Sequence, residues 1–167
     1  MHLPDSTALL GVNMMFVAVV LYIIALNLQE KVGGKETAAM CILTGGFNVL
    51  SALYSGFIMG DPASMAGTLL FGFTYLFFAM NILTQSETYT GMGNYCLFVV
   101  LACIPFIVVN ISAPIFAFLW IMWAQLWGAF WLANGLHKPI QTFLATDTYI
   151  TAAINFVIGI AFLFQVL

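Results

Sequence analysis

Long uncharged stretches separated by a few charged positions dominate the pattern of hydrophobic and polar residues along this chain. Only three Lys or Arg residues and six Asp or Glu residues interrupt it. A membrane-spanning helix needs about 20 apolar residues. Each uncharged stretch can hold one such helix, and the stretch 88–137 can hold two. The pattern therefore predicts six helices, at about 8–28, 37–59, 64–85, 93–111, 114–136 and 144–166.

The break between the fourth and fifth predicted helices falls at 110–114, where Pro114 lacks a backbone donor and restricts the residue before it. All six runs are much longer than the roughly 10 alternating residues of a membrane barrel strand. No basic segment precedes the first run, so we interpret it as a mature helix rather than a signal peptide. The expected class is an all-α integral membrane protein, with one domain over 1–167.

The amino-acid composition agrees with a membrane protein and excludes a soluble domain and a nucleic-acid-binding protein. The chain is 63% hydrophobic and 5% charged, whereas soluble domains carry about 25% charged residues. Nucleic-acid binding needs a basic stripe, and the only strong cations are Lys31, Lys35 and Lys138. The three cysteines lack metal-ligand spacing, and no hydrolase, metalloprotease or phosphate-loop motif is found. We therefore predict no nucleic-acid partner, no enzymatic activity, no metal and no cofactor.

The lysines predict the orientation in the membrane. All three fall in the first or fifth connection between helices, and the termini and the second and fourth connections have none. Cytoplasmic loops carry the excess of Lys and Arg. Both termini of this multi-pass protein are therefore expected to lie outside.

An internal repeat links the third and fifth predicted helices. The segments 70–76 (LFGFTYL) and 126–132 (LWGAFWL) share the order leucine, aromatic, glycine, two residues, aromatic, leucine. The first helix echoes it with Phe16 and Leu21 around Ala18. This pattern predicts a two-helix hairpin used three times in the same direction around a common axis.

Aromatic side chains gather on one face of each of these two helices. At about 100° per residue, Trp120, Trp123, Trp127 and Trp131 span an arc of about 80°, and Phe71, Tyr75 and Phe78 span about 60°. Trp127 and Trp131 are four residues apart and should stack on one face, opposite Tyr75. One interpretation is core packing or an interfacial belt. The other is a flat slot with apolar faces and polar edges, suited to a small planar uncharged solute.

Polar residues inside the predicted spans allow two interpretations. Asp147, Thr151 and Asn155 form a polar stripe on the sixth helix, and intramembrane polar groups often line pathways. Asp147 could equally cap the helix N-terminus. Asn13, Asn48, Asn110 and Gln125 are typical of interhelical hydrogen bonding, and Gln125 lies off the tryptophan face, where a subunit contact is favoured.

The segments 69–76 (LLFGFTYL) with 79–81 (AMN), and 127–132 (WGAFWL), resemble the two signature segments of the AmiS/UreI family of urea channels and amide transporters. The resemblance covers nearly the whole chain. It implies a pore inside each protomer, a homohexamer in a bacterial inner membrane surrounded by lipid, and passive conduction of urea or short-chain amides to a cytoplasmic urease or amidase.

By matching position, the resemblance implies that Phe71, Tyr75, Trp127, Phe130 and Trp131 form pore constrictions, that Leu10, Met14, Val17 and Leu21 line the first-helix side, and that Asp147 corresponds to a pore carboxylate. Trp120, Trp123 and Thr151 complete the predicted pore set from the aromatic and polar faces. The first helix departs from the family pattern, reading Phe16-Val17-Ala18 where an aromatic-Val-Gly is usual.

Acid-activated family members carry several histidines in long outward loops, and these titrate near pH 6.5 when unperturbed. The outward loops here are short and only His2 belongs to that side, so we predict a channel that is not acid-gated. Two alternatives remain open. One is a tryptophan-rich membrane binding protein or receptor for a small hydrophobic ligand, and the other is an ion-coupled small-solute transporter.

Overall fold

A computed structural model describes residues 6–166 and contains six long α-helices. All six are long and apolar enough to cross a membrane, which confirms the predicted all-α membrane class. The protein is a multi-pass membrane protein. The helices are α1 (Ser6–Leu28), α2 (Gly34–Phe57), α3 (Pro62–Leu83), α4 (Thr90–Val109), α5 (Pro114–Phe130) and α6 (Gln141–Leu163). The π-helical turn η1 (Trp131–Gly135) continues α5. Each helix begins and ends within about one turn of the predicted position.

Local sequence explains where α3 and α5 begin. Pro62 and Pro114 occupy the first helical position, where a missing N–H costs nothing because it would have no intrahelical partner. Asp61 caps α3, since its carboxylate accepts hydrogen bonds from the Ser64 backbone N–H at 2.9 Å and from the Ser64 hydroxyl at 2.6 Å. Because α3 and α5 begin at these prolines, the connections that precede them are short: residues 58–61 before α3 and residues 110–113 before α5.

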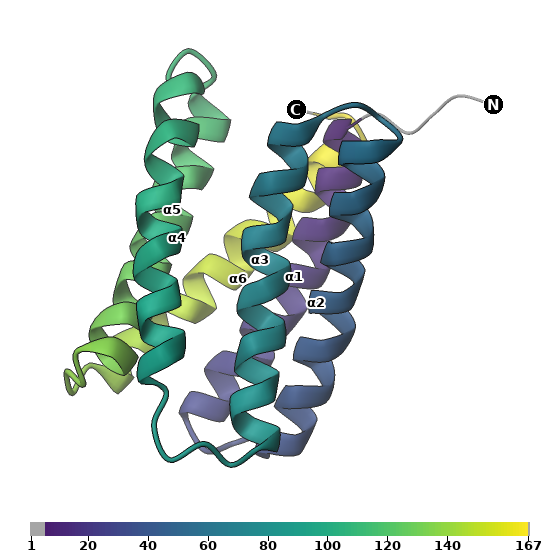
Figure 1. Ribbon diagram of the computed structural model, residues 1–167. Helices are drawn as coiled ribbons and strands as arrows, with labels where there is room; N and C mark the ends of the chain where they lie inside the picture. The colour runs from purple at the N-terminus through teal and green to yellow at the C-terminus, as the bar shows by residue number, and fades with distance from the viewer. Residues whose placement is uncertain (1–5, 167) are drawn as a thin grey trace.

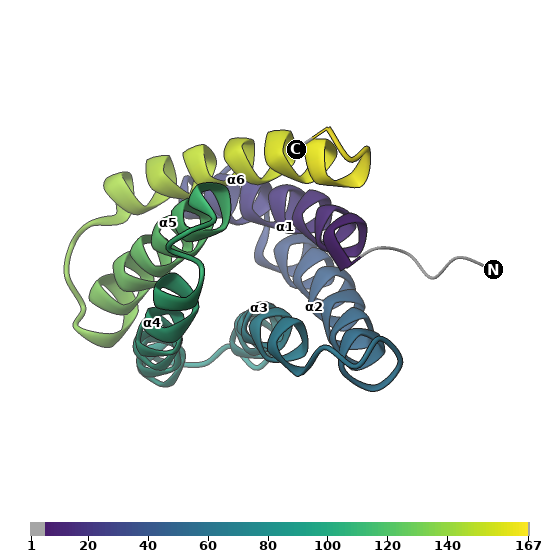
Figure 2. The ribbon, with the colours of Figure 1, turned by 90° about the horizontal axis from the view of Figure 1, so that it is seen from above.

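The helices surround a common interior, with α6 crossing the outer side of α1 (Figures 1 and 2). The most extensive contacts join α1 with α6, α2 with α3, and α4 with α5 and η1. A glycine pair lies at each of these three interfaces. An added Cβ at Gly11 would lie 2.7 Å from the Gly159 oxygen, one at Gly45 would lie 2.9 Å from the Gly72 oxygen, and one at Gly93 would overlap the Gly135 backbone. Small residues at these points let the backbones meet.

The close pairs do not coincide with the predicted hairpins. Within the hairpins, α3 makes few contacts with α4, and α5 makes few with α6. The sequence repeat follows chain order, whereas close packing follows the glycine pairs, which join helices from different hairpins.

The two ends of the bundle differ in charge. We call the end where α1 begins and α6 ends the terminal end, and the opposite end the lysine end (Figure 1). Lys31, Lys35 and Lys138 all lie in or beside the connections at the lysine end. Their clustering at one end follows from the alternating direction of the helices.

Candidate functional site

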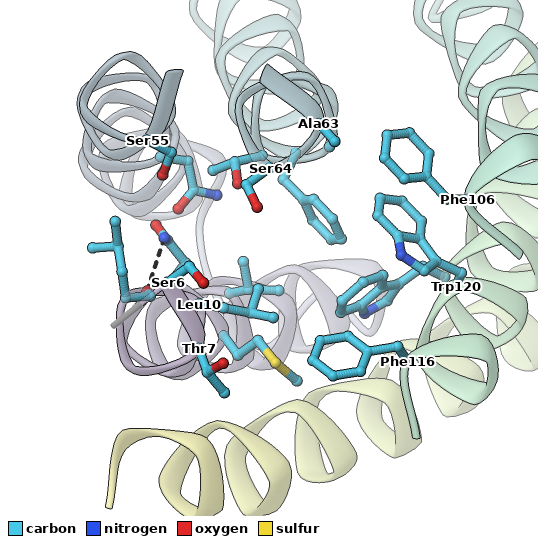
Figure 3. Close-up of a pocket in the computed structure, with 18 of the residues that line it drawn as sticks. Ser6, Thr7, Leu10, Ser55, Ala63, Ser64, Phe106, Phe116 and Trp120 are labelled. Carbon is cyan, nitrogen blue, oxygen red and sulfur yellow. Dashed lines mark hydrogen bonds between the residues drawn. The ribbon is translucent and has the colours of Figure 1, made fainter. Parts of the chain in front are cut away.

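A cavity of about 260 Å³ opens inside the bundle at the terminal end. We call it the outer cavity. Its two walls differ in chemistry. Ser6, Ser55 and Ser64 belong to a wall formed by α1, α2 and α3, and Phe106, Phe116 and Trp120 belong to an aromatic wall formed by α4 and α5 (Figure 3). The ring of Phe106 stacks on that of Trp120, with centroids 4.2 Å apart. A solute in this cavity meets hydroxyl and amide groups on one side and ring faces on the other.

A second, smaller cavity of about 20 Å³ lies deeper, toward the lysine end. We call it the inner cavity. It has room for about one water molecule, which needs roughly 10–15 Å³ by the same measure. Its lining is almost entirely apolar and aromatic, from α1, α3, α4 and α5, and comprises Leu21, Ile24, Phe71, Thr74, Tyr75, Phe78, Met92, Trp123, Leu126, Trp127 and Phe130.

Phe71 and Trp123 line both cavities and therefore lie between them. The Phe71 ring meets Trp123 edge-on at a centroid distance of 4.8 Å and Trp127 at 4.6 Å with a tilt of 58°. Aromatic pairs are in contact at such distances. These three rings, which we call the aromatic constriction, lie where the two cavities meet.

Hydrogen bonds hold both indoles of the constriction. The Nε1–H of Trp127 donates to the Thr74 hydroxyl at 3.1 Å, and that of Trp123 donates to the Asn155 side-chain oxygen at 3.3 Å. The polar edges of the predicted slot are therefore engaged with protein groups. The slot hypothesis assumed that these N–H groups would face the solute, but a buried indole N–H is satisfied more readily by a fixed neighbour.

Most of the predicted pore set lines one of the two cavities. The outer cavity is lined by Leu10, Met14, Val17, Phe71, Trp120 and Trp123, and the inner cavity by Leu21, Phe71, Tyr75, Trp123, Trp127 and Phe130. Side chains from α1, α3 and α5 thus meet in the interior of the bundle. The hypothesis of a slot between the aromatic faces of the third and fifth helices needs such an arrangement.

Trp131, Asp147 and Thr151 line neither cavity, which departs from the prediction. Trp131 begins the π-helical turn, and its ring packs against the last residue of that turn, since a Cβ added at Gly135 would lie 2.7 Å from Trp131 Cδ1. Asp147 accepts a hydrogen bond from Gln125 at 2.8 Å between α6 and α5, and Thr151 is buried and accepts at its backbone oxygen from Asn155.

Two buried asparagines of the outer cavity, Asn13 on α1 and Asn48 on α2, were not singled out as pore residues by the sequence, whereas a third, Asn155 on α6, belongs to the predicted polar stripe. The sequence also missed Phe106 and Phe116, which line the same cavity. The available signal was the spacing of polar residues along α2, where Asn48 and Ser55 are seven apart and share a face.

Asp61 is the one charged residue among those that line the two cavities. The hydrogen bonds that it accepts from the Ser64 hydroxyl and backbone lower the pKa of its carboxyl group below the ordinary value. Within residues 6–166, no group of three His, Cys, Asp or Glu side chains could hold a metal ion. A path lined in this way favours neutral, polar solutes over ions, which need compensating charges or a ring of carbonyls.

Residues 9–165 match the model of the AmiS/UreI family transporters. The chain belongs to this family. The match reaches into all six helices of this AmiS/UreI protein and includes the whole inner cavity, the aromatic constriction and all of the outer cavity except Ser6 and Thr7.

Relatives and solved structures agree with this membership. A Mycolicibacterium smegmatis protein, named as a transporter of amidate substrates, is 33% identical over 159 residues, covering 86% of this chain and 73% of that protein. The Rhodococcus erythropolis transporter protein AmiS2 is 29% identical over 135 residues, covering 77% of this chain and 65% of AmiS2.

The fold is similar to that of the Helicobacter pylori urea channel. The crystal structure of that channel superimposes with a TM-score of 0.82 and 25% identity, covering 93% of this chain and 98% of the channel. Its closed state, solved by electron cryomicroscopy, gives a TM-score of 0.84 over 95% of this chain and 99% of the channel, at 24% identity.

Proposed function

We propose that this AmiS/UreI family protein is a passive channel for urea or short-chain amides. The observation that carries the proposal is the series of outer cavity, aromatic constriction and inner cavity along the bundle interior. Apart from Asp61, which lines the outer cavity, no charged group lines this series, so ions would lose their hydration without compensation. The matched family and the names of its members support the choice of solute.

The aromatic constriction selects solutes that are planar. A flat solute that enters between Phe71 and the two tryptophans keeps dispersion contact on both faces. Net hydrogen bonds of about 1 kcal/mol at the polar wall would bind it weakly enough to leave again. The path residues are Leu10, Met14, Val17, Leu21, Phe71, Tyr75, Trp120, Trp123, Trp127 and Phe130.

Passage requires the constriction to open. The Phe71 ring touches both indoles, while the indoles are tied by hydrogen bonds to Thr74 and Asn155. Phe71 has no polar atom in its side chain, so it is the one ring of the three that no hydrogen bond holds. Rotation of Phe71 is therefore the proposed opening movement, with Trp123 and Trp127 as fixed walls.

Orientation and assembly form part of the same proposal. The lysine end faces the cytoplasm of a bacterial cell, so the outer cavity opens to the outside and both termini lie there. Six copies form a homohexamer, each with its own path, and a cytoplasmic urease or amidase consumes the solute.

Solute flux into vesicles tests the proposal. Liposomes with the purified protein, diluted into urea, should take up the solute and reswell faster than empty liposomes without a sodium or proton gradient. Urea, acetamide, formamide and thiourea compared in the same vesicles would give the solute preference. A requirement for sodium or a pH gradient would contradict passive conduction and favour an ion-coupled transporter. Binding without faster flux would favour a binding protein or receptor.

A further inference from the structure

The buried face of α2 is polar along most of its length. Five hydroxyl or amide side chains on this helix are at most 5% exposed: Thr37, Thr44, Asn48, Ser51 and Ser55. Buried polar groups in a membrane helix are costly unless they have partners or line a pathway. Asn48 and Ser55 line the outer cavity, so this polar face leads from the cavity toward the middle of the bundle.

Asn48 differs from the other asparagines of the cavity in its hydrogen bonding. Within residues 6–166, neither its side-chain nitrogen nor its side-chain oxygen has a hydrogen-bond partner, and both atoms are buried. Asn155, by contrast, donates to the Thr151 oxygen at 2.8 Å and accepts from Trp123. Asn155 is thus held in place, whereas no hydrogen bond fixes the Asn48 amide.

Asn13 presents a second unpaired acceptor at the same wall. Its nitrogen donates to the Leu9 oxygen at 3.0 Å and to the Ser51 hydroxyl at 2.6 Å, so the orientation of the side chain is fixed. Its side-chain oxygen is buried and has no hydrogen-bond partner in the part of the chain that the structure describes. Two neighbouring helices, α1 and α2, therefore contribute two acceptors and one NH₂ donor that lack partners beside the outer cavity.

We propose that Asn48 and Asn13 form a binding site for the carboxamide group of the solute on the polar wall of the outer cavity. The Asn48 nitrogen donates to the solute carbonyl oxygen, and the side-chain oxygens of Asn48 and Asn13 accept from its N–H groups. Urea and primary amides carry both kinds of group on one planar unit. The choice of this solute class rests on the proposed function.

The site needs a side-chain rotation to form. The Asn48 side chain is fully buried in the wall in this structure, and it has no hydrogen bond to lose when it turns toward the cavity. Burying an unpaired amide is unfavourable, so pairing with a solute lowers the free energy of the bound state. The apolar constriction begins at Phe71, which lines the same cavity. The solute would therefore exchange its water here before it reaches the rings.

Binding of acetamide to the purified full-length protein in lipid nanodiscs tests the site without using transport. Saturation-transfer NMR on the acetamide methyl protons gives the dissociation constant. Asn48→Leu keeps the approximate size and removes the amide, so binding should weaken by roughly fivefold for each hydrogen bond lost. Asn48→Ser keeps a single hydroxyl and should weaken binding less. The matched control is Thr44→Val, because Thr44 is buried on α2 one turn from Asn48 and lines neither cavity; acetamide affinity should stay at the wild-type value.

The outcomes separate the site from the proposed function. Wild-type affinity in both Asn48 variants overturns the site, as does the absence of acetamide binding to the wild-type protein. If Asn48→Leu does not fold, the Asn48→Ser variant decides. Weaker binding in the variants, combined with no urea flux through wild-type vesicles, supports the site and rejects the channel function.

Discussion

The indole Nε1–H of Trp127 on α5 donates a hydrogen bond of 3.1 Å to the hydroxyl oxygen of Thr74 on α3. The same hydroxyl donates to the Leu70 backbone oxygen at 2.7 Å, so its position is fixed by its own helix. Both residues are buried. This relationship holds the Trp127 ring at a set distance from Phe71 and makes Thr74 a positioning residue for the constriction.

Thr74→Val should loosen selectivity more than it lowers flux. Valine has a similar shape to threonine but cannot accept from Trp127, so the indole loses a hydrogen bond worth about 1 kcal/mol. We expect a lower ratio of urea flux to glycerol flux in vesicles. Thr74→Ser keeps the hydroxyl and should restore the ratio. If Thr74→Val and Thr74→Ser have the same ratio of urea flux to glycerol flux, the Thr74 hydroxyl does not position Trp127 and the side chain serves only in packing.

Phe71→Ala should remove the barrier between the cavities. Phe71 is one of the two side chains that line both cavities, so without its ring water and glycerol should leak and discrimination between urea and thiourea should fall. Phe73→Ala is the matched control, since Phe73 is on the same helix but 48% exposed on the outer surface. Stopped-flow light scattering of proteoliposomes measures the water and solute fluxes of both variants. If the two variants behave alike, the rings are packing groups rather than a gate.

Trp127→Ala and Trp131→Ala should differ, although the two residues are one turn apart. Trp127 lines the inner cavity and touches Phe71, whereas Trp131 lies at the π-helical turn and lines neither cavity. We expect Trp127→Ala to reduce solute selectivity and Trp131→Ala to leave it near that of the wild type. Flux of urea and thiourea in the same vesicle preparation checks this. The reverse order of effects would contradict the assigned path.

Flux should be nearly independent of external pH between about 5 and 7.5. Asp61 has a lowered pKa because of its hydrogen bonds from Ser64. Its contribution to stability is present above the unfolded pKa and is lost only as the pH falls through the lower folded pKa, so its charge is constant in this window. His2 lies outside the described residues. Urea flux as a function of external pH measures this, and a steep rise on acidification that His2→Gln abolishes would contradict the prediction.

Adjacent glycines of α2 give a stability test of the close helix pairs. A Cβ at Gly45 would lie 2.9 Å from the Gly72 oxygen on α3, whereas nothing lies within 4 Å of one at Gly46. Gly45→Ala should destabilise the protein by about 1–3 kcal/mol. Gly46→Ala should be neutral or stabilising by up to about 1 kcal/mol, since alanine favours helix. Thermal unfolding in one detergent compares them, and equal midpoints would argue against close α2–α3 packing.

The sequence alone determined the membrane class, the six helices and their approximate ends. These depend on local properties, namely the length of each apolar run and the prolines at 62 and 114, which act within one segment. Most of the pore residues that the sequence singled out also line a cavity, and the α-helical period explains why Trp120, Trp123 and Trp127 are among them, since it places the three on one face. The gathering of the lysines at one end followed in the same way from counting helices.

Tertiary structure decided which polar groups remain available. Whether a tryptophan N–H faces the solute depends on its neighbours across the interface, and Thr74 and Asn155 are distant from Trp127 and Trp123 in sequence. Trp131 shares the helical face of Trp127 in the sequence, yet in the structure it lies at the start of the π-helical turn and lines neither cavity. The sequence favoured interhelical hydrogen bonds for Asn13 and Asn48. Only packing shows that the Asn13 amide donates to the Ser51 hydroxyl, while the Asn48 amide has no hydrogen-bond partner among residues 6–166. Hydrogen-bond pairing depends on distances between helices that no single segment encodes.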